Sequence, residues 1–125
     1  MRKVALVLVV AAAAGAIGGG VAVAARKPSP ARLLVTADEF SFVLSRQSIL
    51  AGRAIVQLRN SGEDEHDLKL RKVGGSRTFA VPLARPGRTT ESRPTLAPGT
   101  YRLWCAIGDH AARGMTATLV VRKRT

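Results

Sequence analysis

The sequence predicts an all-β fold, an antiparallel β-sandwich of one domain that follows an N-terminal apolar leader. Three observations carry this prediction: the residues after position 31 form several short β-like runs, Gly, Pro and Asn-Ser signals separate these runs, and no heptad or helical apolar stripe appears. Many short strands at regular spacing are typical of an antiparallel sandwich. Of the 125 residues, about 100 remain after the leader, which is enough for a modest sandwich core.

The first 25 residues have the pattern of an export signal. Arg2 and Lys3 form a short positive start, residues 4–25 are apolar without a charge, and residues 22–24 (Ala-Val-Ala) offer a cleavage site. The apolar stretch exceeds the ~7–15 residues of a usual signal core, so it could also span a bilayer as an uncleaved anchor helix. We therefore expect an exported protein, in the periplasm or at the cell surface, whose residues 1–25 are either a cleaved signal peptide or a retained membrane anchor.

A short tether connects the leader to the expected domain. Residues 26–31 read Arg-Lys-Pro-Ser-Pro-Ala, and the two prolines make such a segment stiff and extended. The predicted organisation is therefore a leader over 1–25, a Pro-containing linker over 26–31, and a single β domain over 32–125.

The expected strands are short and alternate with turn chemistry. We expect strands over residues 33–37, 40–44, 54–59, 67–71, 78–81, 88–95, 101–105 and 116–122. The main turn signals are at 60–62 (Asn-Ser-Gly), 74–75 (Gly-Gly), 85–87 (Arg-Pro-Gly) and 98–99 (Pro-Gly). Because side chains alternate faces along a strand, these ranges also predict which residues point into the core.

The last third of the chain carries a cysteine, a histidine and a methionine at even spacing: Cys105, His110 and Met115. Thiolate and thioether sulfurs are soft metal ligands, and two imidazoles with a cysteine and a weak axial methionine form a blue-copper electron-transfer site. The second imidazole would come from His66. The chain has two histidines, one cysteine and two methionines, so the pattern uses every one of these residues except the initiator methionine.

Strand alternation predicts that these side chains meet inside the fold. His66 shares a face with the leucines of its own strand, Cys105 shares one with Leu103, and Met115 shares one with the apolar residues of the last strand. Three of the four candidates thus lie at a strand end and point toward the core. His110 lies in the loop between Cys105 and Met115, so it can close the site from the solvent side.

Each of these residues also has an ordinary structural explanation. A single cysteine in an exported protein cannot form an internal disulfide, so Cys105 is a free buried thiol, an intermolecular partner or a ligand. Met115 is otherwise a core gap-filler, His66 a hydrogen-bonded strand-end residue, and His110 a surface loop residue. The joint pattern of all four favours a copper site over these separate explanations.

These segments resemble the cupredoxins, the superfamily of plastocyanin and azurin. Residues 99–105 (Gly-Thr-Tyr-Arg-Leu-Trp-Cys) look like the penultimate strand of the family, and residues 108–115 look like its ligand loop. The turn at 60–62, which runs into His66, is similar to the asparagine-glycine turn before the family's first ligand histidine. The resemblance covers about residues 33–122, and its specific part is the Cys-His-Met loop.

The resemblance implies a Greek-key β-sandwich that holds one type 1 copper ion. By this resemblance, His66, Cys105 and His110 would be the equatorial ligands and Met115 the axial one. Four residues separate Cys105 from His110, and four separate His110 from Met115, which matches rusticyanin-like spacing better than plastocyanin or azurin spacing. Electrons would then enter or leave through the edge of His110.

Two residues depart from the family pattern. Family members usually carry Asn after the first ligand histidine and Ser or Thr after the cysteine, and this pair ties the two ligand segments together. Here the two positions hold Asp67 and Ala106. We therefore expect the hydroxyl contact between the segments to be missing.

The charge of the chain indicates the kind of partner. The formal net charge is +12, which favours redox partner proteins with acidic docking surfaces or an anionic membrane surface. The basic residues are scattered and the aromatics are few, so no nucleic-acid partner is expected. We expect a monomer, with membrane attachment through residues 4–25 left open. The acidic run at 63–65, beside His66, is better explained as a solvated turn than as a partner or copper site.

The function predicted from these residues is an exported type 1 copper protein that shuttles single electrons between redox partners, and not an enzyme. A multicopper enzyme needs more histidines, and a binuclear copper centre needs a second cysteine. A Cys-His hydrolase built on Cys105 has no signature around that residue. The main alternative is a copper-binding protein for storage, delivery or sensing, which fast electron exchange would distinguish. A structural domain without stoichiometric copper is the third.

Overall fold

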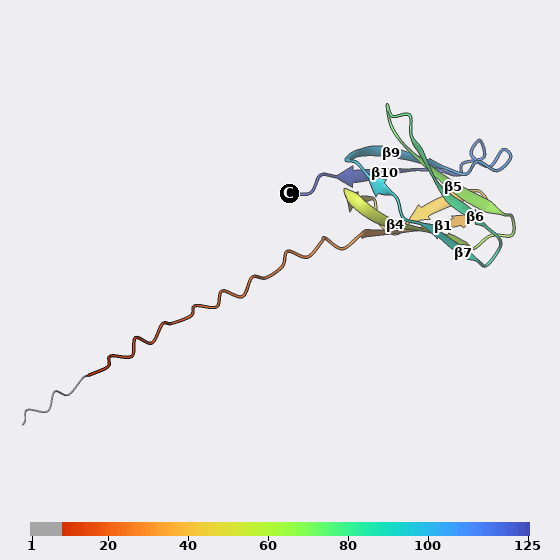
Figure 1. Ribbon diagram of the computed structural model, residues 1–125. Helices are drawn as coiled ribbons and strands as arrows, with labels where there is room; N and C mark the ends of the chain where they lie inside the picture. The colour runs from red at the N-terminus through yellow and green to blue at the C-terminus, as the bar shows by residue number, and fades with distance from the viewer. Residues whose placement is uncertain (1–8) are drawn as a thin grey trace, which may run out of the picture.

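The chain folds into two β-sheets that pack face to face, preceded by a long N-terminal segment (Figure 1). The computed structural model describes residues 9–125. Its strands are β1 (Ala31–Asp38), β2 (Ser41–Leu44), β3 (Ser48–Leu50), β4 (Gly52–Asn60), β5 (His66–Lys72), β6 (Thr78–Ala84), β7 (Thr89–Ser92), β8 (Thr95–Leu96), β9 (Gly99–Trp104) and β10 (Thr116–Arg122). No helix occurs among these described residues, so the predicted all-β fold class is confirmed.

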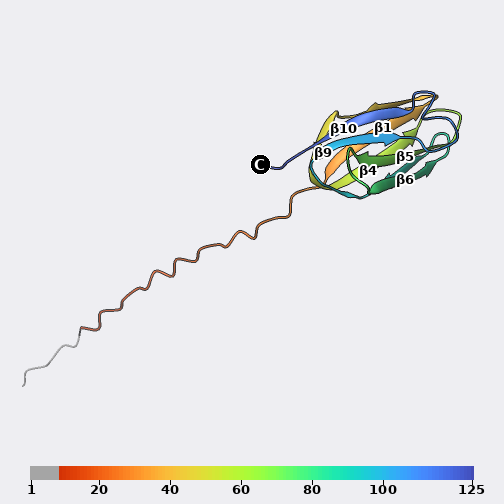
Figure 2. The same cartoon turned by 90° about the horizontal axis from the view of Figure 1, so that it is seen from above.

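Each sheet has five strands. One has the order β2-β1-β4-β7, with β8 also paired to β4, and the other has the order β3-β10-β9-β5-β6. Figure 2 shows β10, β9, β5 and β6 of the second sheet side by side. The other strand pairs are antiparallel, as the sequence predicts, but β1 with β4 and β3 with β10 are parallel. The chain leaves the first sheet after β2, adds β3 to the second, and returns beside β1 in the same direction.

Most strands lie where the sequence predicts them, and the exceptions have local causes. The strand predicted over 116–122 is observed with the same bounds as β10. The run at 88–95, predicted as one strand, forms β7 and β8 with Arg93 and Pro94 between them. Proline has no N–H to donate to a ladder, so it interrupts pairing there. β3 has only three residues, too few to show an alternating pattern in the sequence.

The core fills the space between the sheets with the inward residues of both. In β1 every second residue from Leu33 to Ala37 is buried, as the pleat of a strand requires. The largest fully buried side chains are Tyr101, Leu33, Leu58, Leu68, Leu70, Leu96, Leu103, Met115, Leu119, His66, Val35 and Val56. The Tyr101 hydroxyl donates to the carbonyl oxygen of Ala97 at 2.9 Å, which satisfies its polar group. Three of the four predicted ligand residues, His66, Cys105 and Met115, are buried here, with exposed fractions of 1% or less.

The N-terminal segment carries no regular secondary structure over residues 9–30 (Figure 1). Its last residues contact the sandwich: Arg53 donates to the carbonyl oxygen of Pro28 at 3.0 Å, and Arg124 donates to that of Ser29 at 3.3 Å. Across residues 9–125 no helix has the length and apolar character needed to cross a membrane. The predicted leader over 1–25 falls partly outside the described residues, at 1–8, and stays a prediction, as do the domain boundaries.

Leu103→Ala should destabilise the fold strongly. Leu103 is 0% exposed and lies opposite Leu70 and Ala117 in the second sheet. Loss of its side chain removes transfer free energy and leaves a cavity, so we expect the free energy of unfolding to fall by about 2–5 kcal/mol in urea titrations. The control Val43→Ala, at a position 65% exposed, should change it by about 0.5 kcal/mol or less. Equal losses in the two variants would contradict this core assignment.

Candidate metal centre

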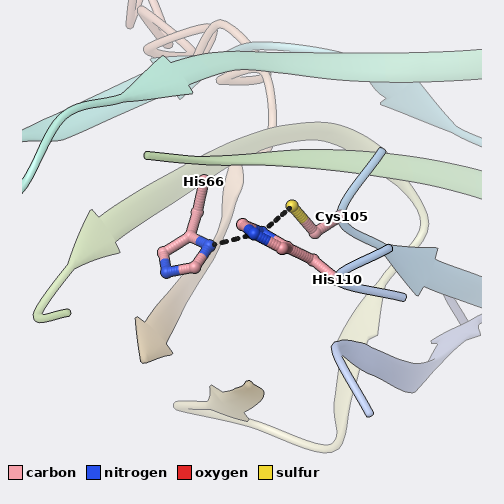
Figure 3. A group of neighbouring side chains, drawn as sticks. All are labelled: His66, Cys105 and His110. Atoms are coloured by element: carbon pink, nitrogen blue, oxygen red, sulfur yellow. Dashed lines mark hydrogen bonds between the residues drawn. The ribbon is translucent and has the colours of Figure 1, made fainter. Parts of the chain in front are cut away.

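Two histidines and the cysteine converge at one end of the sandwich (Figure 3). His66 begins β5, Cys105 directly follows β9, and His110 lies in the loop between β9 and β10. The Nδ1 atoms of His66 and His110 are 3.3 Å apart, and Cys105 Sγ is 3.6 Å from His110 Nδ1. One ligand atom from each residue lies within 4.8 Å of the others. The structure thus brings together three of the four residues singled out in the sequence.

The antiparallel pairing of β5 with β9 positions the first two of these groups. Trp104, the last residue of β9, lies opposite Lys69 in the middle of β5, so the residues that follow Trp104 run toward the start of β5. Side chains alternate faces along both strands, which turns His66 and Cys105 to the core side of the sheet. Their exposed fractions are 0% and 1%, as the alternation in the sequence predicts.

Met115 is joined to this cluster through its backbone. Its N–H donates to the carbonyl oxygen of His110 at 3.1 Å, and its own carbonyl oxygen accepts from the Cys105 N–H at 3.2 Å. The residue is 0% exposed and belongs to the hydrophobic core. Met115 therefore lies beside both loop residues, and its role as an axial ligand stays a prediction.

Glycines shape the loop that carries His110. Gly108 and Gly114 have φ angles of 49° and 120°, in the left-handed region that glycine adopts without a steric penalty. Gly114 also permits a close approach, because a Cβ atom there would lie 3.1 Å from the carbonyl oxygen of Phe40. The His110 N–H donates to the carbonyl oxygen of Ile107 at 3.1 Å. Tight backbone turns thus hold His110 beside the cysteine.

A side-chain to backbone bond ties the two ligand segments together. Asp67 Oδ1 accepts from the Ala106 N–H at 2.7 Å, and this bond connects the residue after His66 with the residue after Cys105. The hydroxyl contact expected to be missing is indeed absent, because Ala106 has no hydroxyl group. The segments are nevertheless joined, because a carboxylate can accept from a backbone N–H whatever side chain that residue carries.

The turn predicted at 60–62 is held by Asn60, whose exposed fraction is 0%. Its Nδ2 donates to the carbonyl oxygens of Asp64 at 2.6 Å and Ala84 at 2.9 Å, while its Oδ1 accepts from the Gly62 N–H at 2.9 Å. All the hydrogen-bonding groups of a buried amide are thereby engaged. The loop that leads into His66 therefore has a defined shape.

Glu39 is a site residue that sequence reasoning missed. It follows the last residue of β1, and its Oε1 accepts from His66 Nε2 at 3.0 Å. The same oxygen accepts from the backbone N–H groups of Glu63 at 2.8 Å and Asp64 at 2.7 Å. The hydrogen bond from the Asp64 N–H makes the largest contribution to lowering the pKa of Glu39, and the bond from His66 the next largest. The pKa of Glu39 is lowered to about 2, so the carboxyl is ionised. No spacing rule connects position 39 to position 66, because different sheets carry them.

His110 is more buried than we expected for a loop residue that closes the site from the solvent side. Its side chain is 11% exposed, and its Nε2 lies 3.7 Å from Asp64 Oδ2. Its ring is tilted against that of Phe40, with the centroids 5.0 Å apart, and the Arg113 guanidinium lies 4.9 Å from the centre of the Phe40 ring. Only a narrow edge of His110 therefore reaches water.

The three converging groups can act together as metal ligands. Because ionised Glu39 can only accept, His66 donates from Nε2 and directs the lone pair of Nδ1 toward Cys105 and His110. Burial raises the pKa of the Cys105 thiol, and a metal ion would bind the thiolate by displacing its proton. One sulfur and two imidazole nitrogens are ligands that suit copper.

Asp67→Ala should loosen the connection between the ligand segments. Loss of the carboxylate leaves the Ala106 N–H to water, and we expect about 1 kcal/mol less stability there, equivalent to roughly fivefold faster amide exchange at Ala106. The control Lys69→Ala breaks only the 3.7 Å ion pair with Asp67 and should change that exchange rate little. If Ala106 exchanges equally fast in both variants and in the wild type, the Asp67 bond does not join the segments.

The fold of the described strands matches that of three solved auracyanins. Auracyanin A, described as a "blue" copper protein from Chloroflexus aurantiacus, superposes with a TM-score of 0.62 and 21% identity over 75% of this chain and 100% of its own. Auracyanin B gives 0.62 and 20% over 78% and 93%. Dithionite-reduced auracyanin from Roseiflexus castenholzii gives 0.58 and 19% over 73% and 96%. No protein-family model and no curated protein sequence matches the chain. The sandwich therefore has the fold of these auracyanins, in agreement with the cupredoxin-like fold class that the sequence resemblance implied.

Proposed function

We propose that the protein is an exported type 1 copper protein that carries single electrons between redox partners. The observation that carries this proposal is the convergence of His66 Nδ1, His110 Nδ1 and Cys105 Sγ within 4.8 Å. Two imidazoles and a cysteine with a weak axial methionine are the ligand set of blue-copper electron-transfer sites. The likeness in fold to a protein described as "blue" copper supports the same assignment.

The residues at this end of the sandwich fit a copper ion. His66, Cys105 and His110 would hold it in the equatorial positions, and Met115 would supply the weak axial contact. Copper would provide a one-electron couple whose potential depends on the axial ligand and on the surroundings of the cysteine sulfur. The exposed fractions of these four residues, 0%, 1%, 9% and 0%, support a site from which bulk water is excluded.

The role of the chain in this function is to hold the ligand groups ready and to bring a partner close. Packed strands carry His66 and Cys105, and hydrogen-bonded turns carry His110, so the groups would move little when the charge of the site changes. The protein would accept one electron from a reduced partner and pass it to an oxidised one, with no bond made or broken in the chain. This is the work of a carrier and does not require an enzyme's substrate site.

Export is the second part of the proposal. The charge-free apolar residues 4–25 and the single cysteine of the chain support it. A retained leader would also attach the protein to the outer side of a membrane.

An acidic partner is favoured by the outer surface of β5 and β9. Arg71 and Arg102 lie directly opposite each other on these strands, and like charges in that position repel. Together with Trp104 they line a surface hollow of about 580 Å³, and the Arg71 guanidinium is 5.7 Å from the centre of the indole ring. A carboxylate from a partner would relieve the repulsion. Since Trp104 precedes Cys105, such a partner would dock one residue away from the proposed ligand.

Addition of one equivalent of Cu(II) to the purified protein should produce an intense visible band from charge transfer between thiolate and copper. Reduction should bleach the band reversibly, and voltammetry should show a one-electron couple. Cys105→Ala should abolish the band because it removes the sulfur. Met115→Leu conserves volume and removes only the weak contact, so it should keep the band.

A colourless wild-type protein would overturn the electron-carrier proposal. A band that cannot be cycled between the two redox states would instead favour copper storage, delivery or sensing. Both outcomes are read from the same sample, because absorption reports the copper–sulfur bond and voltammetry reports the electron exchange.

Binding of an anion should locate the docking surface. Hexacyanochromate(III), a redox-inactive paramagnetic anion, should broaden the amide NMR signals of Arg71, Arg102 and Trp104 more than those of the His110 loop. Arg71→Gln should weaken this broadening. The control Arg32→Gln removes the same charge from the other sheet and should leave it unchanged. Broadening centred on the His110 loop would contradict the location of the acidic partner.

A further inference from the structure

We infer that Glu39 is a positioning residue for the copper site: it orients His66 and places a negative charge that lowers the reduction potential. This inference rests on the proposed copper function. It concerns a residue outside the four proposed ligands and from the opposite sheet. Three contacts with one carboxylate oxygen carry the argument.

The three contacts make Glu39 a bridge between two separate segments. The residue lies in the turn that joins β1 to β2 of the first sheet, and its Oε1 reaches the loop that leads from β4 into β5. There it accepts from His66 Nε2, from the Glu63 N–H and from the Asp64 N–H, at 3.0, 2.8 and 2.7 Å. Because the two backbone donors are fixed by the loop, the oxygen that meets His66 is fixed as well. The side chain is 25% exposed.

This bridge decides which nitrogen of His66 carries the proton. Glu39 Oε1 already accepts from two backbone N–H groups, so it is the acceptor toward His66 as well. The proton therefore lies on Nε2 and the lone pair lies on Nδ1. Nδ1 is the atom that faces His110 at 3.3 Å. A metal-binding histidine is commonly held in this way, with its other ring N–H bonded to a carboxylate, and such partners affect metal affinity about 10–100-fold. Glu39 therefore presents the correct atom of His66 to the site before any metal arrives.

Gly62 provides the space that the carboxylate occupies. A Cβ atom built at this position would collide with the Glu39 carboxylate group. Gly62 is not among the glycines with positive φ, so its backbone can accept alanine, and a flexible side chain is what would have to move. The loop thus leaves a space at Gly62 for the Glu39 carboxylate. A methyl group at position 62 would displace the carboxylate without changing any charge.

The charge of Glu39 sets the direction of its effect on the potential. A negative group bonded to a ligand histidine stabilises the more positive Cu(II) state more than Cu(I). Removal of the charge should therefore favour Cu(I) and raise the reduction potential. Screening by water reduces the effect, because the side chain is partly exposed.

Two variants separate charge from position. Glu39→Gln removes the charge and keeps an oxygen that can accept from the two backbone donors. Gly62→Ala keeps the charge and moves the oxygen. The control Glu63→Gln removes an equal charge at the neighbouring position, where the residue contributes only its backbone N–H to Glu39. Reduction potentials of the copper-loaded proteins and nitrogen-15 NMR spectra of the copper-free proteins are measured, with thermal unfolding as the check on folding.

We expect Glu39→Gln to weaken the preference for Cu(II) over Cu(I) about tenfold, which a one-electron couple converts to a potential about 59 mV higher. Gly62→Ala should raise the potential as well, and its copper-free spectrum should show His66 as a mixture of tautomers where the wild type shows only the Nε2–H form. Glu63→Gln should leave both measurements close to wild type.

Potentials of Glu39→Gln and Gly62→Ala that equal that of Glu63→Gln would overturn the inference and leave Glu39 as a brace of the loop. An Nδ1–H form of His66 in the copper-free wild type would overturn it too. A wild type without the copper–thiolate band would instead overturn the proposed function, while the tautomer spectra would still decide whether Glu39 positions His66. If one variant fails to fold, the other still gives the potential.

Discussion

The register of β5 against β9 is the constraint on which the rest of the structure depends. Leu70 lies opposite Leu103 and Lys69 opposite Trp104, so the residues after β9 run alongside the start of β5, where Asp67 bonds Ala106. Because side chains alternate with a period of two, a shift of one residue would turn the cysteine to solvent while the histidine stayed inside. The leucines on the inner face hold this register, since their burial would be lost in the same shift. Core packing and the candidate metal centre therefore share one cause.

Two carboxylates, from Asp67 and Glu39, connect the segments that carry the candidate ligands. Asp67 bonds the backbone after Cys105, and Glu39 bonds both His66 and the loop before it. Each carboxylate connects segments that are far apart in the chain by accepting from backbone N–H groups. These groups need a hydrogen-bond partner wherever they are removed from water. In the proposed copper site, such contacts would orient the candidate ligand groups, whereas the apolar core fixes where these groups lie. The two carboxylates also place negative charge beside the proposed copper site in a chain that is strongly basic as a whole.

Charge is consequently distributed unevenly over the fold. Around the histidines lie acidic side chains such as Glu39 and Asp64, while the outer face of β5 and β9 presents Arg71 opposite Arg102. A partner could thus reach the proposed copper site either at the exposed edge of His110, which has acidic neighbours, or at the surface beside Trp104, which has basic ones. In the proposed function, this difference lets one small protein distinguish partners of different charge, since complementary potentials guide encounter and orientation.

The sequence by itself determined the fold class, most strands and the four candidate ligands. Period-two alternation and turn residues are local signals, and the few histidine, cysteine and methionine residues of the chain left little choice among candidate copper ligands. Only the tertiary structure decided the parallel pairings of β1 with β4 and β3 with β10, the bond from Asp67 to Ala106, and the place of Glu39. These pairings and contacts depend on which strands become neighbours although long loops separate them in the chain. The alternation of residues within one strand does not predict which strands pair. Strands, turns and candidate ligand residues can therefore be predicted from the sequence, whereas contacts between distant segments cannot.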